Sequence, residues 1–145
     1  MNRRKRRVFV LLTMLMTSVG MLANEKNEAA SATFNWNPVM EAIIQVESKG
    51  NPRAVSGNSC GAMQITPIMV AECNNILKKR KSKKRFTLAD RFNVAKSKEM
   101  FILFQSFHNP KNNVEQAIRS WNGGMRYTVR GTQRYFNKVM KYLKH

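Results

Sequence analysis

Acidic residues are scarce in this chain of 145 residues, because eight Asp and Glu stand against 26 Lys and Arg and give a formal net charge of +18. A surface so rich in one sign predicts an anionic partner. Nucleic acid, membrane headgroups and an acidic cell-wall polymer all fit the charge alone. The scarcity also leaves few candidates for acid chemistry: Glu25, Glu28, Glu41, Glu47, Glu72, Asp90, Glu99 and Glu115.

Cysteine and histidine are scarcer still, with two residues of each type. Neither His108 nor His145 has a second His or Cys at a spacing typical of zinc sites, so we expect no metal and no cofactor. Cys60 and Cys73 fit two interpretations equally well. An exported chain could pair them as a disulfide, or they could be two small buried thiols.

The chain also lacks a convincing alternation of apolar and polar residues, the pattern that predicts β-strands. Short strands stay open near residues 53–56 and 124–129. Apolar residues at helical spacing instead predict five helices, which begin near Asn37, Pro67, Asn93, Val114 and Thr132. Asn37 and Thr132 are expected as N-caps. The predicted fold class is α+β, predominantly α-helical, with little or no strand.

The apolar run at residues 8–16 is too short to span a membrane comfortably. It follows the basic residues 3–7 and precedes small residues that end at Ala23, a pattern typical of a secretory signal peptide. An uncleaved N-terminal anchor is the alternative. We therefore predict an exported, periplasmic or extracellular protein with a signal peptide (1–23), a flexible lead-in (24–35) and a folded domain (36–145).

Glu47 is the most informative residue, because it interrupts an apolar stripe. Met40, Ile43, Ile44 and Glu47 stand at i, i+3, i+4 and i+7 of the first predicted helix. A carboxylate beside apolar side chains, near the negative end of a helix dipole, is disfavoured. Both effects raise the pKa of the carboxyl group and predict a general acid.

Four sequence blocks follow one another in a recognisable order. They are Glu47-Ser48, then Gly61-Ala62-Met63-Gln64-Ile65, then Trp121-Asn122-Gly123-Gly124, then Tyr135. In these blocks the chain resembles a lytic transglycosylase of the soluble-lytic superfamily, which is goose-type-lysozyme-like. The resemblance runs from about Val39 to Val139 and implies a lysozyme-like catalytic domain.

The resemblance implies cleavage of the β-1,4 bond between N-acetylmuramic acid and N-acetylglucosamine in peptidoglycan. Glu47 would protonate the leaving oxygen and then take a proton from the C6 hydroxyl of the muramic acid, which closes on C1 as a 1,6-anhydro sugar. A nucleophile within the substrate gains from proximity and makes a second carboxylate unnecessary. The implied substrate-binding residues are Ser48, Met63, Gln64, Trp121, Asn122 and Tyr135, of which Tyr135 would tune the proton of Glu47.

Each of these residues also has a structural interpretation. Met63 fits the core as well as a sugar-binding role, and Trp121 completes an apolar helical stripe and is expected in the core. The chain departs from the family at Trp121, where Tyr is common, and at Ala62, where a bulkier residue is common. Asp90 is the best second acid, and we expect it to cap or charge the start of the following helix instead.

Residues 78–85 hold seven basic residues in eight positions and belong to no family motif. We expect this run on the surface, where it attracts an anionic wall or only aids solubility. Three rival functions stay open: a hydrolytic muramidase on the same scaffold, a non-catalytic wall-binding or assembly protein, and a nucleic-acid-binding protein. The last lacks a recognition motif and conflicts with export. The expected partners are therefore glycan strands and cell-envelope machinery, with no nucleic acid, and we expect a monomer.

Overall fold

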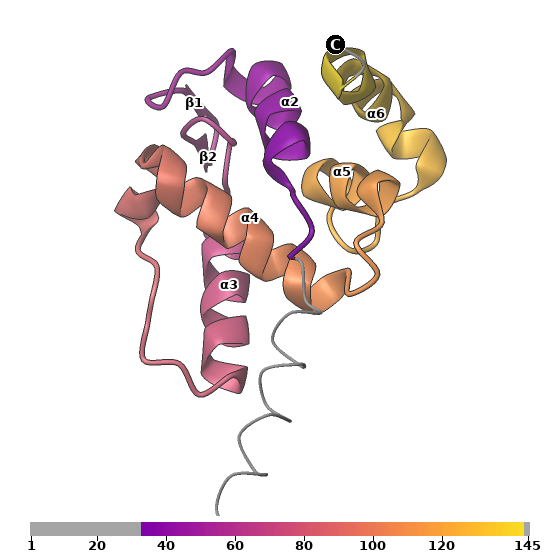
Figure 1. Ribbon diagram of the computed structural model, residues 1–145. Coiled ribbons are helices and arrows are strands. Elements are labelled where there is room, and N and C mark those ends of the chain that lie inside the picture. The colour runs from indigo at the N-terminus through magenta and orange to yellow at the C-terminus, as the bar shows by residue number, and fades with distance from the viewer. Residues whose placement is uncertain (1–32, 144–145) are drawn as a thin grey trace, which may run out of the picture. The chain divides into compact units, whose positions relative to one another are not determined.

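The computed structural model describes residues 33–143, in which a helix and a short hairpin precede the remaining helices (Figure 1). The predicted signal peptide, most of the lead-in and His145 lie outside these residues. Five α-helices and two short strands in the described part confirm the predicted fold class. The elements are α2 (Asn37–Ser48), β1 (Val55–Ser56), β2 (Ser59–Cys60), α3 (Pro67–Lys79), the 3-10 helix η1 (Leu88–Phe92), α4 (Val94–His108), α5 (Val114–Gly123) and α6 (Val129–Leu143).

Helix α2 carries the predicted acid at its C-terminal end. Its apolar stripe is buried at Met40, Ile43 and Ile44, as the spacing predicts. The predicted N-cap is wrong by one residue, because Trp36 is the N-cap and Asn37 is already helical. The Asn37 amide instead donates to Oδ1 of Asn35 at 3.0 Å. The helix ends where Lys49 adopts a left-handed conformation with φ of 55°.

Helix α4 lies at the centre of the core and packs against α3 (Figure 1). The Phe101 ring stands 5.6 Å from the Trp36 ring and 5.1 Å from the Trp121 ring, measured between centroids, and so joins the segments around α2 and α5. Phe101 is fully buried, whereas Phe107 in the last turn of α4 is 37% exposed.

The last helix begins before the residue predicted as its cap. Thr132 lies inside α6 and is buried, and its hydroxyl lies 2.8 Å from the Thr128 carbonyl oxygen. Thr128 accepts from the Gly131 amide at 3.0 Å, which is the contact expected of an N-cap. The sequence gives Thr at both positions, and burial of Thr132 against α5 decides between them.

The hairpin confirms one of the two places left open for strands. Val55 pairs with Cys60 and Ser56 with Ser59, whereas residues 124–128 contain no strand.

Cys60 and Cys73 are both buried and unpaired. Burial, together with the nearby charge of Glu72, raises the pKa of the Cys73 thiol to about 12. No helix in residues 33–143 combines the length and the apolar character needed to cross a membrane.

Candidate active site

Glu47 and Tyr135 meet across the packed helices α2 and α6, although 88 residues separate them in the sequence. The Tyr135 hydroxyl donates to Oε1 of Glu47 at 2.7 Å. Burial raises the pKa of the Glu47 carboxyl, and the hydrogen bond from Tyr135 lowers it by less, so the net direction is upward. Burial and the Glu47 charge raise the pKa of Tyr135, so the phenol stays a donor. The Glu47 carboxyl group therefore keeps its proton to higher pH than an exposed glutamate does.

Ser48 joins the end of α2 to the loop that precedes α3. Its hydroxyl donates to the Ala62 carbonyl oxygen at 2.8 Å, and the Ile44 carbonyl oxygen lies 3.3 Å away. The contact fixes the loop at residues 61–65 beside the residue that follows Glu47.

The loop at residues 61–65 is a tight turn closed by backbone bonds. Cys60 and Ile65 exchange both amide–carbonyl hydrogen bonds, at 3.0 and 2.9 Å. Gln64 has a left-handed backbone with φ of 51°, and its side-chain amide donates to the carbonyls of Gly61 at 2.9 Å and Ala54 at 3.2 Å. These bonds orient the Gln64 side chain, whose Oε1 accepts no hydrogen bond from a described residue.

Met63 and Trp121 belong to the packing behind this loop. Met63 is 0% exposed, and its carbonyl oxygen accepts from Nε1 of Trp121 at 3.1 Å. Burial favours the core interpretation for both side chains, since Met63 offers no surface to a ligand. Asn122, the next residue on α5, is exposed. The structure thus brings Glu47 to Tyr135, Ser48 to residues 61–65 and Trp121 to Met63.

A comparison with protein families matches residues 25–143 to the transglycosylase SLT domain, over most of the chain. The chain belongs to this family. An SLT domain indicates lytic transglycosylase activity on peptidoglycan, as the sequence blocks suggested. Searches of curated proteins and of solved structures gave no match.

Arg119 is a component of the SLT domain that sequence reasoning missed. It is 2% exposed, and its guanidinium donates to the Val129 carbonyl and the Thr132 hydroxyl, each at 3.1 Å. Further bonds reach Glu115 at 2.8 Å and Gln133 at 3.0 Å. Arg119 therefore ties α5 to the first turns of α6, just before Tyr135. The sequence offered one signal for Arg119, its i,i+4 spacing from Glu115. The same spacing is typical of ion pairs on a helix surface, so it did not indicate a buried arginine.

The remaining acids of the described SLT domain contact basic side chains. Asp90 accepts from the Thr87 amide at 2.8 Å and pairs with Lys96 at 3.0 Å, and these bonds hold its pKa below the ordinary value. Asp90 thus forms a capping box with Thr87 at η1, close to the expected role at the start of α4. The other pairs are Glu41–Lys98, Glu72–His108, Glu99–Lys84 and Glu115–Arg119. His108 is the last residue of α4.

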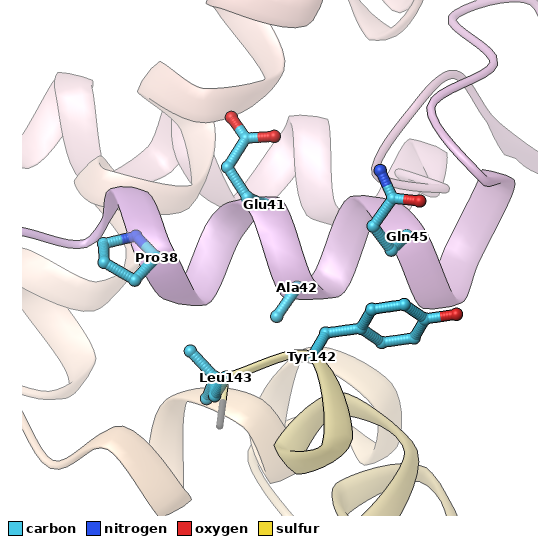
Figure 2. A pocket seen from close by; sticks show the side chains of 6 residues that line it. All are labelled: Pro38, Glu41, Ala42, Gln45, Tyr142 and Leu143. Carbon is cyan, nitrogen blue, oxygen red and sulfur yellow. The ribbon is translucent and has the colours of Figure 1, made fainter. Parts of the chain in front are cut away.

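A shallow pocket of about 240 Å³ lies between α2 and α6 (Figure 2). Its lining residues come from the outer side of α2 and the end of α6: Pro38, Glu41, Ala42, Gln45, Tyr142 and Leu143. Glu47 is not among them. This pocket is therefore distinct from the Glu47–Tyr135 contact.

We expect Tyr135→Phe to move the alkaline limb of the pH profile upward. Removing the phenol deletes the contact that lowers the Glu47 pKa, so the acid stays protonated to higher pH. The measurement is kcat/KM as a function of pH. At its optimum the variant should have a kcat/KM lower than that of the parent by about tenfold or less. Tyr142→Phe is the matched control, because Tyr142 is exposed on the same helix. A limb that stays in place or moves down would contradict the assigned contact.

Proposed function

We propose that this chain is an exported lytic transglycosylase that cleaves the bond between N-acetylmuramic acid and N-acetylglucosamine with a single acid, Glu47. The observation that carries the proposal is the contact between the partly buried Glu47 carboxyl group, whose pKa is raised, and the Tyr135 hydroxyl at 2.7 Å. A carboxyl group kept protonated by burial can protonate a glycosidic oxygen at near-neutral pH.

One carboxyl group, that of Glu47, carries out both proton transfers of the reaction. Glu47 gives its proton to the leaving oxygen, the bond from C1 to that oxygen breaks, and positive charge develops at C1. The C6 hydroxyl oxygen of the same sugar then bonds to C1, and its proton passes to the Glu47 carboxylate. The products are a 1,6-anhydromuramoyl end and a free N-acetylglucosamine end, with no water consumed. Closure within one sugar is favoured by proximity.

The other residues of the site serve binding and positioning. Gln64 is oriented by Gly61 and Ala54, and its Oε1 suits the N–H of an N-acetyl group. Asn122 is exposed and available for a glycan strand. Ser48 and Trp121 hold the loop at residues 61–65 in place through hydrogen bonds to its backbone, and the buried Met63 side chain anchors the same loop in the core. No step requires a metal or a cofactor.

A hydrolytic muramidase is the second candidate, and it needs a base to activate water. Asp90 suits this role poorly, because its carboxylate is committed to Thr87 and Lys96. A non-catalytic wall-binding protein would have no use for a partly buried carboxyl group whose surroundings disfavour its ionised form. The single-acid mechanism therefore accounts best for the residues at the site.

The test is digestion of purified peptidoglycan by the purified protein, followed by borohydride reduction and mass spectrometry. The proposal predicts soluble fragments with anhydro ends, which borohydride leaves unchanged. Fragments with reducing ends would support the muramidase, and the absence of any soluble fragment would support the binding protein.

A further inference from the structure

The basic segment, residues 78–85, is a shaped surface and not a loose tail. Leu77 and Phe86, which flank it, are both buried. The Asn74 side chain holds Phe86 by two bonds to its backbone, at 2.9 and 2.8 Å. Inside the segment, the Ser82 amide donates to Leu77 and the Lys81 amide to Lys78, each at 2.9 Å. A segment with fixed ends and internal bonds loses little conformational entropy when it binds a ligand.

The charge of this surface is almost uncompensated within the described part of the chain. All seven basic side chains between residues 78 and 85 are exposed. Among the acids of residues 33–143, only Glu99 pairs with the segment, through Lys84. Gathering like charges destabilises a fold through repulsion, so the arrangement suits binding to an external anion.

The basic segment lies at the far end of α3 from the candidate active site (Figure 1). The loop at residues 61–65 leads directly into the first turn of α3, and the segment begins in its last turn. A helix of 13 residues is roughly 20 Å long at 1.5 Å per residue. An anion bound to the segment is therefore well separated from Glu47.

The composition of the segment favours an anionic polymer over a membrane. Basic segments that dock on lipid usually add apolar side chains that enter the bilayer, and residues 78–85 contain none. Phe107 is nearby, but Lys79 Nζ stands 4.9 Å from its ring centroid and Arg80 Cζ 6.0 Å. The ring thus supports the cations and helps to hold them on the surface.

We infer that the basic segment is a second attachment site that binds the carboxylates of the peptide side chains of peptidoglycan while the glycan lies at Glu47. The inference rests on the proposed function, because that function supplies a polymer long enough to reach both ends of α3. Lys and Arg bind carboxylates through charge-assisted hydrogen bonds. The segment would keep the enzyme on the wall between successive cuts.

The test compares two triple variants, each placed in full-length protein that carries Glu47→Gln so that the wall is not digested. One replaces Lys78, Lys81 and Lys83 with Gln. The matched control replaces Lys111, Lys138 and Lys141, which are also exposed, and so removes the same charge elsewhere. We expect the first to bind purified sacculi about tenfold more weakly at low salt, with the difference vanishing at high salt. The control should bind nearly as well as the parent.

Three further arms identify the anion and separate this inference from the proposed function. Glycan strands stripped of their peptides should bind the parent and the first variant equally. Equal binding of both to intact sacculi would overturn the inference, as would a loss confined to anionic phospholipid vesicles or to duplex DNA. The variant that replaces Lys78, Lys81 and Lys83 but keeps Glu47 should still release fragments with anhydro ends from peptide-free strands. If the parent releases none, the proposed function fails whatever the binding shows.

Discussion

Glu47→Gln will lose nearly all turnover on peptidoglycan, by roughly 10²–10⁴-fold or more, which is the range of a general-acid contribution. The substitution keeps the side-chain volume and an oxygen that can accept from Tyr135, but it removes the proton that the leaving oxygen needs. We expect the fall in kcat, with binding to sacculi retained. The measurement is the initial rate of soluble fragment release.

Glu41→Gln is the matched control for this experiment. Glu41 lies on the same helix, is exposed and pairs with Lys98 at the surface. Its replacement should leave turnover within about twofold of the parent, since surface pairs contribute little. Wild-type rates from Glu47→Gln, or an equal loss from Glu41→Gln, would remove Glu47 from the mechanism.

The same substitution should also reveal a stability penalty at the site. The folded pKa of Glu47 is raised above its unfolded value, so the folded state loses stability as pH rises from the unfolded pKa through the folded one. Glu47→Gln does not ionise and escapes this loss. At about pH 8 its Tm should equal or exceed that of the parent, and the advantage should disappear below about pH 4.

Gly61→Ala is the second substitution with a large expected effect. A Cβ atom at Gly61 would stand 1.8 Å from the Arg91 carbonyl oxygen, and φ at this position is +81°. A backbone carbonyl cannot rotate away as a side chain can, so the loop at residues 61–65 or the segment at η1 must shift. We expect a loss of about 3–5 kcal/mol in the free energy of unfolding, from overpacking and left-handed strain together. Chemical denaturation measures it.

Gly57→Ala separates the two causes of that loss. Gly57 also has a positive φ, +59°, but an added Cβ would meet nothing within 4 Å. Its replacement should cost only about 1–2 kcal/mol, the strain of the left-handed backbone. If Gly61→Ala were no less stable than Gly57→Ala, the close approach of Arg91 to the loop would be wrong.

Much of the fold was predictable because the apolar spacing of the helices is strong and local. Asn37-Pro38 and Thr66-Pro67 marked the starts of α2 and α3 to within a residue. The stripe that contains Glu47 also predicted the raised pKa of its carboxyl group, since a charged residue at an apolar position is visible without any tertiary information.

The missed features depend on contacts between distant segments. The sequence could not place Thr132 against Arg119, so its burial inside α6 went unrecognised. The η1 helix, with its Thr87–Asp90 capping box, is too short to have a periodic signal. The need for glycine at position 61 arises from Arg91, 30 residues later, and local turn chemistry carries no sign of it.

The most direct test of the central claim is an NMR titration of the Glu47 carboxyl carbon in the unliganded protein. Burial with one donor, Tyr135, predicts a pKa clearly above the ordinary value for glutamate, and a further rise in Tyr135→Phe. A pKa at or below the ordinary value would show an acid already ionised at neutral pH, and would contradict the role of Glu47 as the proton donor.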